Sequence, residues 1–267
     1  MKYLLSDYNI EQLRSFCKKG PVLFAFDLDG TLAKIEKRPC DVKIANNLIP
    51  LLLKLQDETT LAIISGRKLS DIKKILPFKT KHIVGNHGLE GLNTNETKIK
   101  MIEKICQKWE KSLNKIIDNP KKKMFVENKG YSISVHYRLC KNKKKIKQVI
   151  LKTCSLLSPK PFIMQGKQVI DLIHPDSSNK GDAIIKLIEV TKAKKVFYLG
   201  DDRTDENVFT LPNKYKIFKT RVGYSKKSKA NFYIKRQSEI LPLLKLLTTT
   251  LALRRGSATS HHRKINK

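Results

Sequence analysis

The sequence predicts an α/β protein in which a parallel, Rossmann-like sheet is interrupted by an inserted α+β domain. Short apolar runs that suit buried strands alternate with helical patterns over residues 7–88 and again after residue 174. This alternation is typical of a parallel sheet with helices on its faces. Between these segments, Asn128-Lys129-Gly130 and Gly166-Lys167 each separate two short strand-like runs, which indicates hairpins and antiparallel pairing. We therefore expect a core of residues 1–88 and 174–253 and a cap domain of residues 89–173.

The first core segment contains three expected strands, each preceded by a helical pattern. We expect Asp41 to cap a helix that reaches about Gln56 and bends at Pro50. The helix after the second strand ends where Pro77 follows. In chain order, the expected elements are a helix at 7–18, a strand at 22–27, a helix at 41–56, a strand at 60–64, a helix at 69–76 and a strand at 81–84.

The cap and the second core segment follow. A long helix is expected to bury one stripe of apolar side chains that includes Trp109. The polar residues 254–267 are expected to form a disordered basic tail. In chain order, the expected elements are a helix at 97–118, strands at 123–127 and 131–137, a helix at 142–157, strands at 162–165 and 168–173, a helix at 179–190, strands at 195–199, 216–220 and 231–234, and a helix at 237–250.

Composition indicates a globular protein without a membrane span. The chain has 267 residues, 40% of them hydrophobic, and no apolar run approaches the roughly 20 residues that span a bilayer. The N-terminus becomes acidic too early for a secretion signal. The five cysteines form no CxxC pair, so the sequence suggests neither a disulfide framework nor a zinc site. We expect a cytoplasmic protein.

The net charge of +31 is the most unusual property of the composition. It is compatible with a nucleic-acid or acidic-lipid partner. However, the excess lysine is spread along the chain, and no interleaved aromatic residues suggest a platform for stacking bases. We therefore favour a lysine-rich solvated surface that steers anionic substrates, with no nucleic acid and no membrane as partner.

Two carboxylates follow the first core strand. The apolar run Val22 to Phe26 ends at Asp27, and Asp29 follows before Gly30 and Thr31. In open parallel sheets, ligands bind at the carboxyl ends of the strands. Two acids held this close repel each other unless a cation, a proton or a strong donor lies between them. The alternative is an acidic turn in which Asp29 only bonds to the backbone.

Other strand ends carry residues that would complete a site for phosphoryl transfer. Such a reaction needs an in-line nucleophile, cations near the phosphoryl oxygens and a proton donor for the leaving oxygen. Asp27 suits the nucleophile and Asp29 the general acid and base. The expected metal ligands for Mg²⁺ are Asp27, Asp201, Asp205 and the backbone carbonyl of Asp29. Ser65, Lys180 and the amides around Gly30 and Gly66 would bind the phosphoryl group.

Each of these segments also has an ordinary structural explanation. Ser65-Gly66-Arg67 is also compatible with a simple turn, Lys180 with a solvated helix face, and the acids of 201–206 with a helix N-terminus. All of these residues nevertheless fill roles in one reaction, which favours a common site.

These residues resemble the four motifs of the haloacid dehalogenase superfamily of Mg²⁺-dependent phosphatases. The chain is more narrowly similar to the trehalose-6-phosphate phosphatase family over about residues 20–235. The resemblance implies a Mg²⁺-dependent hydrolase that acts on trehalose 6-phosphate, with further substrate contacts at Thr31, Arg67 and His87. The motifs that carry the narrower resemblance are Ser65-Gly66-Arg67, Gly85-Asn-His-Gly-Leu-Glu90, Glu127-x-Lys129, His136-Tyr137-Arg138, Gly166-Lys167, Asn179-Lys180-Gly181 and Gly200-Asp-Asp-Arg-Thr-Asp-Glu206.

The resemblance also implies a sugar-binding set in the cap. Its positions are Glu127, Lys129, His136, Arg138 and Lys167. Asp171 stands where the family usually has a glutamate, which leaves the carboxylate with a shorter reach. A phosphatase for sucrose phosphate or mannosyl-3-phosphoglycerate is therefore an alternative, and a basic nucleic-acid-binding protein on an inactive scaffold is a third. We expect a monomer.

Overall fold

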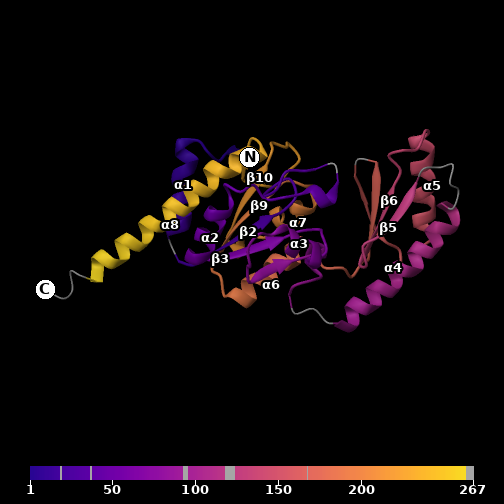
Figure 1. Ribbon diagram of the computed structural model, residues 1–267, viewed down its shortest axis with the longest axis horizontal. Coiled ribbons are helices and arrows are strands. Elements are labelled where there is room, and N and C mark those ends of the chain that lie inside the picture. Colours follow the sequence, from indigo (N-terminus) through magenta and orange to yellow (C-terminus); the bar gives the residue numbers. More distant parts are fainter. Residues whose placement is uncertain (19, 37, 93–95, 118–123, 167, 263–267) are drawn as a thin grey trace. The chain divides into compact units, whose positions relative to one another are not determined.

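The computed structural model describes all residues except 19, 37, 93–95, 118–123, 167 and 263–267. The chain divides into two compact units, residues 1–92 with 179–267 and residues 93–178. The expected cap, residues 89–173, begins and ends four to five residues earlier than the second unit. Figure 1 shows an α/β core and a smaller unit with its own sheet.

The first unit is built on a seven-stranded sheet in the order β1-β11-β10-β9-β2-β3-β4. All neighbouring strands are parallel, which confirms the predicted α/β class. Its strands are β1 (Lys2–Tyr3), β2 (Val22–Asp27), β3 (Thr60–Ile64), β4 (His82–Val84), β9 (Lys195–Gly200), β10 (Ile217–Val222) and β11 (Phe232–Ile234).

Helices cover both faces of this sheet, which explains why β2 and β3 are apolar along nearly their whole length. Phe24 and Phe26 of β2 belong to the same core as the apolar side chains of α1, α2, α3 and α8. Leu23 and Ala25 point to the other face, where they share a core with α6 and α7. The helices are α1 (Asp7–Lys18), α2 (Ile49–Glu58), α3 (Leu69–Ile75), α6 (Lys180–Thr191), α7 (Glu206–Phe209) and α8 (Ile240–His262).

The second unit contains a four-stranded antiparallel sheet in the order β5-β6-β8-β7. Its elements are α4 (Glu96–Ile117), β5 (Phe125–Asn128), β6 (Ser132–His136), α5 (Lys143–Ser155), β7 (Phe162–Gln165) and β8 (Val169–Ile173). Both predicted hairpins are present, as β5–β6 and β7–β8. Trp109 of α4 is 1% exposed, as the predicted apolar stripe requires.

Two predicted helices differ from the structure. Residues 41–48 form no α-helix: a short 3₁₀ turn (Pro39–Asp41) is followed by extended chain, and Ile44 pairs with Ala33. Pro50 lies in the first turn of α2 rather than at a bend, because its missing N–H costs nothing there. At the other end of the chain, α8 continues to His262, into the segment expected to be disordered. Arg254 of α8 donates a hydrogen bond to the Gly20 carbonyl at 2.9 Å, and this bond attaches the helix to the segment before β2.

Among the described residues, none of the helices has both the length and the apolar character needed to cross a bilayer. The five cysteines all lie within the described residues and form no disulfide, and four of them are buried.

Candidate active site

The turn after β2 brings two distant acidic segments together. Asp27, the last residue of β2, is 4% exposed. Gly30 has a φ of +78°, and a Cβ atom there would lie 2.2 Å from Oδ2 of Asp201. Only glycine fits both the left-handed backbone and this close approach. Thr31 is also buried, and its hydroxyl donates to Asp201 at 3.4 Å. The turn from Asp27 to Thr31 therefore packs closely against the Asp201 side chain.

Lys180 joins two of the acids. Its Nζ donates to Oδ1 of Asp27 and to Oδ1 of Asp205, each at 2.7 Å, and its side chain is only 3% exposed. Lys180 is the first residue of α6, and Asn179 caps that helix in a reciprocal capping box with Asp182. The cap fixes where the helix begins, so the local sequence places the buried ammonium group at the acidic site.

Asp205 is held by three donors. Besides Lys180, the Tyr198 hydroxyl donates to Oδ1 at 2.6 Å and the Asp202 amide donates to Oδ2 at 2.8 Å. Burial alone would raise the pKa of Asp205, but Lys180 and the other donors outweigh it and hold that pKa below its usual value. Sequence analysis did not identify Tyr198. The available signal was a tyrosine within the apolar run Val196 to Leu199, because a tyrosine hydroxyl that is buried needs a hydrogen-bond partner.

Three carboxylates form a candidate metal site. Asp27, Asp201 and Asp205 each offer an oxygen, and these atoms lie within 4.8 Å of one another. Burial and the neighbouring carboxylates raise the pKa of Asp27 well above its usual value, although Lys180 opposes this. Burial, followed by the charge of Asp205, raises the pKa of Asp201 to about 6.

The charge and the donor type of this group fit a hard divalent cation. Three carboxylates and the Lys180 ammonium, whose raised pKa keeps it charged, leave a formal charge of −2. Oxygen donors of this kind suit Mg²⁺ or Ca²⁺. Asp29 is not part of the group: its carboxylate accepts two bonds from Arg67, both at 2.7 Å. The prediction that Asp29 is a metal ligand therefore depends only on its backbone carbonyl oxygen.

The ends of β3 and β4 supply a second set of predicted residues. Ser65 directly follows β3 and is 1% exposed, and its Oγ accepts a bond from the Arg67 amide at 3.2 Å. A Cβ atom at Gly66 would lie 2.4 Å from Cε1 of His87. Asn86 and His87 both have positive φ angles, of 46° and 58°. A strained turn therefore holds the His87 imidazole against the Ser65-Gly66 turn.

A polar cluster lies on the sheet of the second unit. Nε2 of His136 lies 2.9 Å from Oε2 of Glu127. Nζ of Lys129 lies 4.0 Å from Oε2 of Glu127 and 3.9 Å from Oδ1 of Asp171. Asp171 also accepts a short hydrogen bond from the Ser134 hydroxyl. The structure thus brings together four of the six residues predicted to bind the sugar.

Of the two other residues predicted to bind the sugar, Arg138 lies within the described part of the chain. Arg138 lies two residues beyond β6 and is exposed. Lys167 lies outside the described residues.

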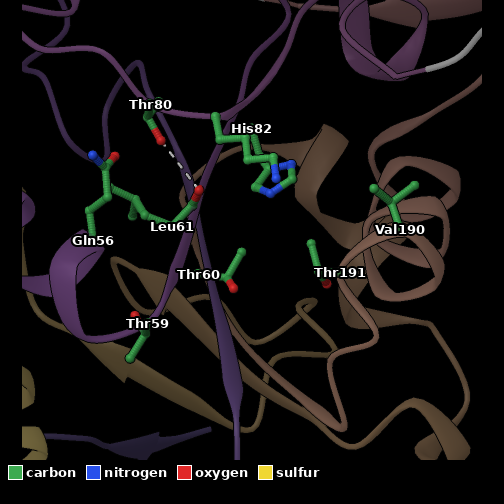
Figure 2. A pocket seen from close by; sticks show the side chains of 9 residues that line it. Gln56, Thr59, Thr60, Leu61, Thr80, His82, Val190 and Thr191 are labelled. Carbon is green, nitrogen blue, oxygen red and sulfur yellow. Dashed lines mark hydrogen bonds between the residues drawn. The ribbon is translucent and has the colours of Figure 1, made fainter.

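A separate hollow of about 400 Å³ lies at the opposite edge of the core sheet (Figure 2). Thr60 and His82, the first residues of β3 and β4, contribute to its wall. The acids lie at the carboxyl ends of the strands, so this hollow is not the candidate active site.

A comparison with protein families identifies the chain. The model of the family described as trehalose-phosphatase matches residues 25–238. The chain belongs to the trehalose-phosphatase family. It is therefore a phosphoric monoester hydrolase.

Individual relatives agree with this assignment. The chain is 26% identical over 242 residues to the trehalose-6-phosphate phosphatase of Escherichia coli (strain K12), covering 88% of this chain and 90% of the relative. A crystal structure of a trehalose-6-phosphate phosphatase related protein has a similar fold, with a TM-score of 0.68, 23% identity and coverage of 87% of this chain and 99% of the other.

A haloalkanoate (HAD) superfamily phosphatase of Bacteroides thetaiotaomicron also shares the fold. Its TM-score is 0.56 at 15% identity, with coverage of 86% of this chain and 95% of the other. The chain therefore has the fold that the sequence predicted, that of the haloacid dehalogenase superfamily.

Proposed function

We propose that the chain is a Mg²⁺-dependent phosphatase that hydrolyses trehalose 6-phosphate to trehalose and phosphate through an aspartyl-phosphate intermediate on Asp27. The observation that carries this proposal is the buried bridge from Lys180 to Asp27 and Asp205, with Asp201 beside it. The family match and the name of the E. coli relative support the choice of substrate.

In the first chemical step, a carboxylate oxygen of Asp27 forms a bond to phosphorus while the bond from phosphorus to the sugar oxygen breaks. Asp29 gives a proton to that leaving oxygen. In the second step, water attacks the aspartyl-phosphate, Asp29 takes the proton from the water, and the Asp27 carboxylate is restored with release of phosphate. Ser65 and the amides around Gly30 and Gly66 would hold the phosphoryl oxygens.

The contact between Asp29 and Arg67 bears on this role. The side chains are 33% and 19% exposed, so the pair is partly accessible. Both Asp29 oxygens accept bonds from Arg67, whereas in the first step one of them must donate a proton to the leaving oxygen. We therefore propose that a bound substrate phosphate draws Arg67 from Asp29, which would reconcile this contact with the predicted role of Arg67 in substrate binding.

The acidic group fits Mg²⁺, with Asp27, Asp201 and the Asp29 carbonyl as the proposed ligands. Mg²⁺ would neutralise charge on the phosphoryl oxygens. Asp205 has both oxygens engaged by Lys180, Tyr198 and the Asp202 amide. We propose that Asp205 mainly positions Lys180, which differs from its predicted role as a metal ligand.

The polar cluster of the second unit is the proposed sugar site. Carboxylates of Glu127 and Asp171 can accept bonds from sugar hydroxyl groups, and Lys129 and His136 can donate to hydroxyl or phosphate oxygens. Hydroxyl recognition by buried or constrained polar groups gives strong discrimination, because an analogue that lacks the hydroxyl leaves them unpaired.

Phosphate release from a panel of sugar phosphates, with and without Mg²⁺, tests the proposal. We expect trehalose 6-phosphate to be the best substrate, EDTA to stop the reaction and added Mg²⁺ to restore it. Faster turnover of sucrose phosphate or mannosyl-3-phosphoglycerate would replace the substrate but keep the reaction. Salt-dependent DNA binding without any Mg²⁺-dependent phosphate release would favour a nucleic-acid-binding role instead. A cytoplasmic location and a monomeric state remain predictions.

A further inference from the structure

We propose that Phe125 is the platform on which the sugar ring of the substrate stacks, and that it helps to determine substrate specificity. The inference rests on the proposed function and adds to the polar cluster a residue that neither the motifs nor the comparisons identify. Phe125 is a large apolar side chain that is 58% exposed although it lies in a regular strand.

Strand register places Phe125 on the same face as the polar cluster. Phe125 pairs with His136, and Glu127 pairs with Ser134, which in turn pairs with Asp171. Directly paired residues and residues two apart in a strand share one face of a sheet. The opposite face carries Ile133, Val135, Ile170 and Leu172, all fully buried. Phe125 is therefore on the polar-cluster face and not part of the core of this unit.

The orientation of the Phe125 ring is fixed by the cluster itself. Its centroid lies 4.4 Å from that of the His136 imidazole, with 9° between the ring planes. His136 in turn contacts Glu127 at 2.9 Å. One side of the phenyl ring is thus covered by His136, and the exposed area lies on the rest of the ring. The Phe125 ring therefore presents a planar apolar surface beside the carboxylates and cations of the polar cluster. Its orientation is set before any ligand binds.

This combination matches the chemistry of a pyranose ring. A pyranose carries hydroxyl groups around its edge and C–H groups on its faces. The hydroxyl groups need hydrogen-bond partners such as Glu127, Lys129 and Asp171. The C–H groups carry partial positive charge and are attracted to the electron-rich face of an aromatic ring. Binding sites of this type combine an apolar wall with a few placed polar groups.

Steady-state kinetics of Phe125→Leu test the proposal. With trehalose 6-phosphate, we expect KM to rise about three- to tenfold, the range typical of one aromatic contact, while kcat changes less than about twofold. With ethyl phosphate, which has no sugar ring, we expect no change in KM. Phe125→Tyr keeps an aromatic face and should retain the parent KM.

Phe162→Leu is the matched control. Phe162 is 70% exposed and lies on the same face, but on the outer strand β7 at the other edge of the sheet. An unchanged KM for trehalose 6-phosphate in Phe125→Leu would overturn the proposal, as would an equal rise in Phe162→Leu or with ethyl phosphate.

Fluorescence gives a second readout that does not depend on turnover. The chain has one tryptophan, Trp109, which is buried, so Phe125→Trp would introduce an exposed emitter at the proposed platform. Its emission should change saturably as trehalose is added, and that of Phe162→Trp should not. No change in Phe125→Trp would overturn the platform. Failure of the unsubstituted protein to hydrolyse any sugar phosphate would instead overturn the proposed function.

Discussion

Replacing Asp27 with asparagine separates chemistry from folding at this site. The Asp27 side chain is 6% exposed, and its Oδ1 accepts the Lys180 bond at 2.7 Å. An asparagine amide oxygen can accept the same bond, but it cannot attack phosphorus. We expect phosphate release from trehalose 6-phosphate to fall at least about 10⁴-fold, a barrier increase of about 5.5 kcal/mol.

Stability should not fall with activity. Burial and the neighbouring carboxylates of Asp205 and Asp201 raise the pKa of Asp27. An uncharged amide at position 27 is not repelled by those carboxylates and costs less to bury, so the unfolding free energy measured in EDTA should be unchanged or should rise by about 1 kcal/mol, equivalent to about 2–4 °C in Tm.

The control for this experiment is Asp41→Asn. Asp41 forms an exposed ion pair with Arg38 at 2.7 Å, so its replacement should affect neither activity nor Tm. Phosphate release by Asp27→Asn within tenfold of the parent would show that the nucleophile is misassigned. Loss of activity together with a fall in Tm of about 10 °C or more would show that Asp27 is needed mainly for folding.

The remaining predictions concern four other residues. Asp29→Asn should lower turnover of trehalose 6-phosphate about 10²- to 10⁴-fold but affect p-nitrophenyl phosphate less, because nitrophenolate leaves without a proton; equal losses would contradict the general-acid role. Glu127→Ala should raise KM for trehalose 6-phosphate and leave ethyl phosphate hydrolysis unchanged, whereas equal effects would place Glu127 in folding or chemistry. The Mg²⁺ concentration for half-maximal activity should rise as the pH falls through about 6, because Asp201, with a pKa of about 6, must lose its proton to bind metal; a flat profile from pH 7.5 to 5.5 would argue against Asp201 as a ligand. Tyr198→Phe should lower the unfolding free energy by about 1–2 kcal/mol in urea denaturation, and no change would show that its bond to Asp205 adds nothing to stability.

Sequence patterns predicted the elements that depend on local chemistry. The apolar run before Asp27 gave the bounds of β2, and the asparagine at position 179 lies where α6 is capped. Parallel strands bring their carboxyl ends to one edge of a sheet, so the residues that follow the strands identified the acids of the site.

The differences arise where tertiary contacts decide. The segment from Asp41 to Leu48 has a helical pattern, but Val42 and Ile44 are instead buried in extended chain. The pairing of Asp29 with Arg67 joins residues 38 positions apart, and no spacing rule indicates it. Phe125 was assigned to a strand, but its exposure and its stacking on His136 depend on how the four strands pair.

The central position of β2 also limits the order in which a nascent chain can fold. β2 lies between β3 and β9, and β9 begins only at Lys195, after residues 93–178 have left the ribosome. The inserted unit is continuous in sequence and can close its own sheet first, while one edge of an apolar strand in the core is still unpaired. Such edges promote association between chains. A charge of +31 opposes that association through mutual repulsion between chains.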